Sequence, residues 1–168
     1  MKRKEAFTGD EVKLLMAKLP QDKIGWSIRL MLGTGMRTQE LLALEPRHIT
    51  EEGTFITIEQ ALVMEKGTAA IGTPKSYDSY RCVPVPENIR YCARLLRDTH
   101  NKFIWESVKK PGMPCNPSYF RDKFKAAVKA GIKNPKIIVT VDKFCRLLND
   151  SNMPIAIYNW HIVVDEYH

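Results

Sequence analysis

The sequence has 168 residues, of which 44% are hydrophobic and 27% are charged. This composition excludes a disordered or low-complexity chain, and the length suits one domain. Lys and Arg total 26 against 19 Asp and Glu, so the formal net charge is +7, which favours nucleic acid or an anionic membrane surface as partner. The apolar runs are too short to span a bilayer, and no secretory signal follows the basic tail at residues 1–6. We therefore expect a cytoplasmic protein.

The N-terminal part of the chain carries the signals of three short helices. A capping box at residues 8–11 starts a helix that ends before Pro20. Apolar residues recur at helical spacing over residues 22–32. The glycines within residues 33–35 then separate this second helix from a third, which we predict over residues 37–44.

From Phe55 the hydrophobic period changes from helical to alternating. Residues 55–60 have the pattern of a strand with one face in water. Residues 69–73 and 80–85 are predicted as two more strands, joined by a turn at residues 74–79. Together they predict one small three-stranded antiparallel sheet.

The C-terminal half returns to helix. We predict a helix over residues 87–99, a short strand at 103–105 and a helix from Pro117 to Gly131. Residues 140–149 are helix-compatible, and no repeat or long linker divides the chain. The prediction is a single domain over residues 1–168 with an α+β fold, mostly helical, with the small sheet inserted.

The cysteines and histidines do not follow the spacing of a metal site or a disulfide framework. We expect reduced and mostly buried thiols, no metal and no cofactor. The cysteines are Cys82, Cys92, Cys115 and Cys145.

Arg37 follows the glycine break and precedes an apolar helical segment. An arginine held rigidly beside backbone N–H groups suits a phosphate, because its planar guanidinium donates two parallel hydrogen bonds. The alternative is an ordinary surface arginine after a helix–helix turn.

Lys75 is predicted at the tip of the turn between two strands. An ammonium there can protonate a departing alkoxide or neutralise a phosphate. The alternative is a turn lysine that only aids solubility.

A basic helix forms the third candidate. Phe120, Phe124 and Val128 recur on one face, which leaves the cations to face water. Such a face suits a nucleic-acid backbone, although it also occurs as an ordinary solvated surface. The cations are Arg121, Lys123, Lys125, Lys129, Lys133 and Lys136.

Two of these segments resemble motifs of one family. Residues 34–44, TGMRTQELLAL, closely resemble the first arginine motif of the tyrosine recombinases, or phage integrases, and residues 73–86, TPKSYDSYRCVPVP, resemble their β-hairpin lysine segment. The order and separation of the two also fit. The resemblance covers about residues 7–132 and is to integrases of conjugative transposons and phages.

The resemblance implies a catalytic domain that cuts and rejoins double-stranded DNA through a 3′-phosphotyrosine, without metal or cofactor. Arg37 would clamp the scissile phosphate and Lys75 would protonate the 5′-oxygen. Arg81 and the basic helix would contact DNA. The family works as oligomers on paired DNA sites, and neither a membrane nor a small-molecule substrate is implied.

Residues 133–168 depart from the family pattern. Lys143 and Arg146 stand in for the family's His-x-x-Arg, His161 loosely matches its later histidine, and Tyr167 is the candidate nucleophile. Tyr167 follows Arg146 by 167 − 146 = 21 residues, which is shorter than the family interval. The family's N-terminal core-binding domain is also absent, so a truncated chain is expected.

Three functions stay open on the sequence. The first is a recombinase that performs strand transfer. The second is a catalytically inactive DNA-binding remnant of an integrase. The third is a basic helical module that binds RNA or a protein and only mimics the motif.

Overall fold

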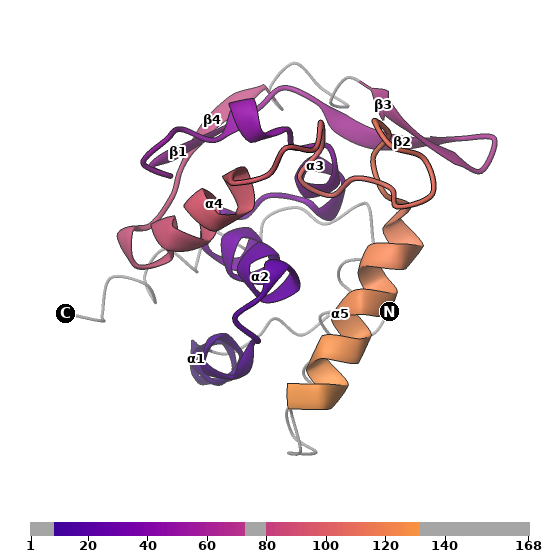
Figure 1. Ribbon diagram of the computed structural model, residues 1–168. Coiled ribbons are helices and arrows are strands. Elements are labelled where there is room, and N and C mark those ends of the chain that lie inside the picture. Colours follow the sequence, from indigo (N-terminus) through magenta and orange to yellow (C-terminus); the bar gives the residue numbers. More distant parts are fainter. Residues whose placement is uncertain (1–8, 73–79, 132–168) are drawn as a thin grey trace, which may run out of the picture.

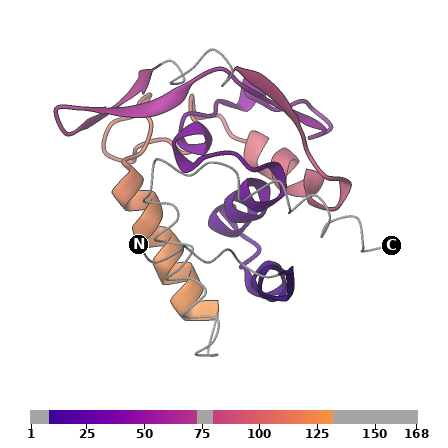
Figure 2. The same ribbon diagram turned by 180° about the vertical axis from the view of Figure 1, so that it is seen from behind.

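The computed structural model describes residues 9–72 and 80–131 (Figure 1). Within them the strands lie along one side of the molecule and the helices below, an arrangement that Figure 2 shows from behind. The α+β fold is thereby confirmed. The elements are α1 (Gly9–Lys18), α2 (Lys23–Thr34), α3 (Thr38–Leu42), the 3₁₀ turn η1 (Pro46–His48), β1 (Phe55–Ile58), β2 (Ala61–Glu65), β3 (Thr68–Gly72), β4 (Arg81–Pro84), the 3₁₀ turn η3 (Glu87–Ile89), α4 (Arg90–Arg97) and α5 (Pro117–Gly131).

Helix α2 is the centre of the core and packs against α3, α4 and α5. Asp22 caps its start, with the carboxylate accepting from the Gly25 N–H at 2.9 Å. Only glycine fits at position 25, because the Cβ of any other residue would lie 1.8 Å from the carbonyl oxygen of Pro20. This close approach brings the end of α1 onto the first turn of α2.

Arg29 of α2 holds that junction together. Its side chain is only 4% exposed and donates to the carbonyls of Met16, Leu19 and Pro20 at 3.1, 2.7 and 2.9 Å. Met16 lies in the last turn of α1, where a helix leaves its C=O groups without partners, and Leu19 and Pro20 directly follow the helix. One buried guanidinium therefore satisfies acceptors that the fold would otherwise leave unpaired.

The strands form two separate antiparallel pairs, β1 with β4 and β2 with β3, instead of one three-stranded sheet. The predicted alternation in β1 is confirmed, since Ile56 and Ile58 are buried while Phe55 and Thr57 face water. The chain leaves β1 after Ile58 because the next two side chains are bound elsewhere. Glu59 pairs with Arg47 and His48, and Gln60 donates to the Ala43 carbonyl at 2.6 Å.

The chain then restarts as β2, over residues that were not predicted to form a strand. Strands β2 and β3 are joined by Lys66 and Gly67, whose φ angles are +48° and +79°. Two successive positive φ values suit the type I′ turn that connects tight hairpins. The hairpin therefore closes on itself and leaves β1 to pair with β4.

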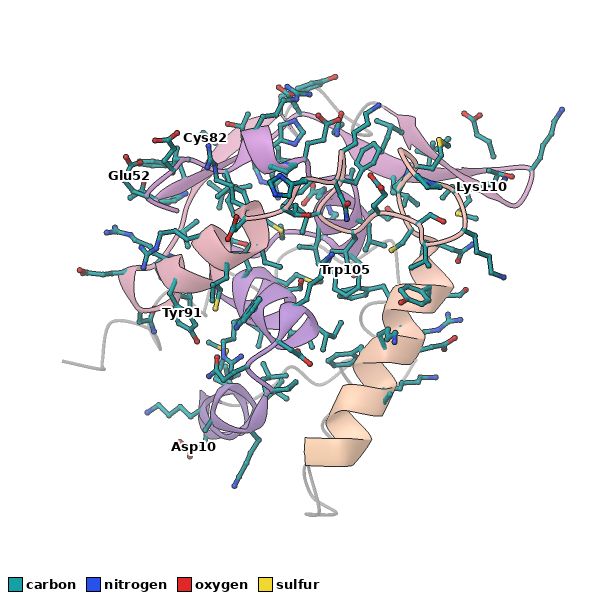
Figure 3. All side chains as sticks on the ribbon, viewed as in Figure 1. Asp10, Glu52, Cys82, Tyr91, Trp105 and Lys110 are labelled. Carbon is teal, nitrogen blue, oxygen red and sulfur yellow. The ribbon has the colours of Figure 1, made fainter. Side chains whose placement is uncertain are left out.

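Residues 103–105 do not form the predicted strand. All three side chains are buried, and the Ile104 N–H donates to the Leu44 carbonyl at 2.8 Å. Trp105 lies between α2 and α5 (Figure 3), donating to Ser27 at 2.9 Å and meeting the Phe120 ring edge-on at 4.9 Å. A strand would turn alternate residues to opposite faces, whereas this turn inserts each of them into the core.

The helix predicted over residues 87–99 forms as the 3₁₀ turn η3 followed by α4, which ends at Arg97. Asn116 accepts from the Ser118 N–H at 2.8 Å, so α5 begins at Pro117 as predicted. Of the cysteines that the structure describes, Cys92 and Cys115 are buried and Cys82 is exposed. Burial raises the pKa of the Cys115 thiol to about 11. Across residues 9–72 and 80–131, none of the helices has the length and apolar character to cross a bilayer.

Replacing Arg29 by Met is expected to destabilise the protein by about 3 kcal/mol, because three carbonyls lose a charged donor while the space stays filled. Urea denaturation measures the loss. The matched control is Arg94→Met, which removes a single exposed bond of 3.2 Å to the Glu52 carbonyl and should cost about 0.5 kcal/mol. Equal losses in the two variants would contradict the role assigned to Arg29.

Candidate phosphate-binding site

The backbone break before Arg37 is set by one glycine. Helix α2 continues through Gly33 to Thr34, and Gly35 then adopts the left-handed conformation with φ +69° and donates to the Met31 carbonyl. This is the usual glycine C-cap, since a Cβ at this φ is strained. Met36 is 2% exposed and anchors the turn in the core. Arg37 consequently leaves the core at a fixed point.

Arg37 is the N-cap of α3, not a residue of its first turn as predicted. Helix α3 has only five residues and ends at Leu42 instead of Leu44. The backbone N–H of Arg37 donates to Glu40 Oε2 at 2.7 Å. This N–H is therefore not available to a ligand, contrary to our expectation. Leu41 and Leu42 are completely buried and fix the helix.

Glu40 lies at the centre of a cluster of two arginines. Its side chain is 2% exposed, and Arg81 of β4 donates to both carboxylate oxygens at 2.9 Å, Nη1 to Oε1 and Nη2 to Oε2. Arg37 Nη1 approaches Oε1 at 3.3 Å. We call Arg37, Glu40 and Arg81 the arginine–glutamate cluster. Its two cations and one anion leave a net charge of +1.

The two arginines of the cluster bind Glu40 unequally. The Arg81 bonds have the length of strong charge-assisted hydrogen bonds, whereas the Arg37 contact is longer. The Arg37 side chain is 56% exposed and that of Arg81 is 31% exposed. The Arg37 side chain is thus largely exposed to solvent beside a carboxylate that Arg81 already binds through both oxygens. This arrangement can bind an anion such as a phosphate.

The other predicted catalytic residues lie outside the described residues. These are Lys75, Lys143, Arg146, His161 and Tyr167, and their roles stay predictions. The described chain stops at Gly72, the end of β3, and resumes at Tyr80, next to Arg81 of the cluster. The arginine motif is therefore bonded to β4, the strand that lies within the lysine segment of residues 73–86.

The basic helix is α5, and the predicted burial of Phe120 and Phe124 is confirmed, while the side chain of Val128 lies outside the described residues. Phe120 and Phe124 are buried against the core, while Lys123 and Lys125 are exposed and Arg121 is partly exposed. Lys129 belongs to α5 by its backbone. The DNA-binding role of these cations stays a prediction.

Glu40 lies within the arginine motif of residues 34–44, but no role was predicted for it. The signal was its position three residues after Arg37, the spacing at which a glutamate reaches back to an N-cap N–H. Its bond to Arg81 spans 41 residues of sequence and had no local signal.

A second polar cluster, also missed, joins η1 to the end of β1. His48 is buried, accepts from the Glu45 N–H at Nδ1 and donates from Nε2 to Glu59 at 2.9 Å. Arg47 bonds both carboxylates, at 2.7 Å to Glu45 and 2.8 Å to Glu59. Burial lowers the pKa of His48, and the hydrogen bond from His48 lowers the pKa of Glu59.

No protein-family model and no curated protein matches the chain. Several solved structures share its fold. The Tn1549 transposon integrase in complex with circular intermediate DNA matches 100% of this chain at a TM-score of 0.62 and 18% identity. A variant of that integrase in complex with transposon right end DNA matches at 0.63 and 20%, and XerA recombinase matches 98% of this chain at 0.53 and 17%.

The fold is that of the tyrosine recombinases. At identities of 17–20%, the similarity to these structures concerns the fold alone. The chain spans 60–62% of the length of these structures, so it corresponds to part of such a protein. The resemblance inferred from residues 34–44 and 73–86 is confirmed at the level of tyrosine recombinase architecture.

The His48 cluster predicts acid-sensitive folding. A folded-state pKa below the ordinary 6.5 means that the unfolded chain binds the proton more readily. The stability that neutral His48 contributes is therefore complete above about pH 6.5 and is lost as pH falls. The lowered pKa of Glu59 adds a further loss below its ordinary 4.5.

Urea midpoints measured from pH 7.5 to 5 should fall, and His48→Gln should flatten the profile. His100→Gln, at an exposed histidine, is the control and should keep the wild-type slope. A wild-type slope in His48→Gln would contradict the assignment.

Proposed function

We propose that this chain binds double-stranded DNA as the catalytic domain of a site-specific recombinase, which cuts and rejoins strands through a 3′-phosphotyrosine. The observation that carries the proposal is the half-exposed Arg37 side chain, whose guanidinium contacts the buried Glu40 carboxylate. DNA complexes of the structurally similar Tn1549 integrase support DNA as the partner.

Arg37 would bind the non-bridging oxygens of the scissile phosphate. A guanidinium donates two parallel hydrogen bonds to a phosphate and keeps its charge at any physiological pH. The cluster positions the Arg37 guanidinium before DNA binds. The guanidinium therefore needs less reorientation when negative charge builds up on the phosphate in the transition state. This is the electrostatic part of the reaction.

The proposed reaction exchanges one phosphoester for another. The Tyr167 hydroxyl gives its proton to water as its oxygen attacks the phosphorus, the bond between the phosphorus and the 5′-oxygen breaks, and Lys75 gives the 5′-oxygen a proton. Lys143, Arg146 and His161 would share the charge of the phosphoryl oxygens with Arg37. Because the phosphotyrosine conserves the energy of the phosphodiester bond, rejoining needs no nucleotide cofactor.

Helix α5 would add sequence-independent contacts. Lys123 and Lys125 are exposed, on a helix whose phenylalanines face the core. Cations in this position can follow a DNA backbone, and Lys129 lies one turn further on. Each phosphate neutralised adds to the salt dependence of binding. An oligomer on paired DNA sites is part of the proposal.

The reaction is tested with a nicked duplex whose cleavage releases a short fragment and so traps the covalent complex. We expect a protein–DNA adduct that survives denaturing electrophoresis. Arg37→Ala should lower its yield at least about 100-fold, as loss of a transition-state charge partner does, and Tyr167→Phe should abolish it.

The control variant is Arg47→Ala, which removes an exposed arginine bonded to Glu45 and Glu59 and should leave the adduct yield unchanged. Absence of an adduct with salt-sensitive duplex binding retained would contradict strand transfer and favour the inactive remnant. Equal binding of RNA and duplex DNA would contradict both.

A further inference from the structure

Arg81 was expected to contact DNA, yet its guanidinium binds the buried Glu40 carboxylate. Both terminal nitrogens donate to the Glu40 carboxylate at 2.9 Å in a fork-to-fork arrangement. That carboxylate is 2% exposed, whereas the Arg81 side chain is 31% exposed and that of Arg37 is 56% exposed. The more exposed arginine is thus the one that binds Glu40 more weakly.

A buried carboxylate needs cationic donors, because removing its charge from water is costly unless it is paired. Glu40 has two arginines within reach, and Arg81 supplies the two shorter guanidinium bonds. If Arg81 were removed, Arg37 would be left as the cationic partner of Glu40 in the cluster. Its guanidinium would then be drawn onto the carboxylate, and its donors would be lost to a phosphate.

We propose that Arg81 is a positioning residue. It binds both carboxylate oxygens of Glu40 and so keeps the Arg37 guanidinium available for a phosphate. This inference rests on the proposed function for the identity of the ligand. It assigns Arg81 a role through Glu40 in place of direct DNA contact. The bond also joins β4 to α3, across 41 residues of sequence. One carboxylate therefore fixes the positions of both arginines.

A double-mutant cycle separates positioning from direct contact. Duplex binding is measured against salt for wild type, Arg37→Ala, Arg81→Gln and the double variant. Each lost phosphate contact lowers the slope of log K against log salt by about 0.9. If Arg81 acts through Arg37, each single variant and the double variant should all lose about one contact. A loss of about two contacts in the double variant would overturn the proposal.

Neutralising Glu40 supplies the second test. The double variant Arg81→Gln/Glu40→Gln lacks the carboxylate that would bind Arg37. The slope of log K against log salt should therefore return towards the wild-type value. The matched control is Arg81→Gln/Glu52→Gln, which restores the same net charge at an exposed glutamate on the periphery (Figure 3) and should not rescue. Equal rescue by both would overturn the proposal, because charge alone would then explain it.

A third measurement does not depend on duplex binding. The Arg37 side-chain N–H signal is followed by NMR of ¹⁵N-arginine-labelled protein during titration with inorganic sulfate, with Arg37→Lys to assign the signal. Arg81→Gln should raise the Kd for sulfate several-fold, and an unchanged Kd would overturn the proposal. Where Arg81→Gln does not fold, Arg81→Lys replaces it, with one bond in place of two and a smaller change in the same direction.

The two proposals fail in different ways. A wild-type slope in Arg37→Ala would contradict the phosphate clamp of the proposed function. Wild-type slopes in Arg81→Gln, beside a reduced slope in Arg37→Ala, would overturn only the positioning role.

Discussion

The buried carboxylate of Glu40 is the group on which the candidate site depends, because it joins α3 to β4. An ionised group at 2% exposure is tolerated only with charged partners, and these come from α3 and from β4. Its oxygens hold the Arg37 backbone, the Arg37 guanidinium and the Arg81 guanidinium together. The position of the candidate site therefore depends on this one side chain.

The surrounding core fixes the position of the arginine–glutamate cluster. Gly35 ends α2 at the residue that allows the chain to turn towards Arg37. Leu41 and Leu42 bury the short α3, which packs against β2, while Arg29 secures α2 to α1. A helix of five residues has little stability alone, so packing and the Glu40 bonds must supply it. Rigidity at Arg37 is thus a property of the whole core.

Local signals predicted most of this fold, and long-range bonds account for what they missed. Asn116 and Pro117 marked the start of α5, and the alternation of Ile56 and Ile58 marked β1. The split after β1 depends on Glu59 and Gln60 binding η1 and α3, which periodicity cannot register. Likewise the family motif pointed to Arg37, but its bond through Glu40 to Arg81 required the folded chain.

The most direct measurement is a crystal structure of the chain bound to a short duplex. The account predicts an Arg37 Nη atom within about 3 Å of a phosphate oxygen, with both Arg81 nitrogens still on Glu40. A structure in which Arg81 binds the phosphate while Arg37 lies on Glu40 would contradict it.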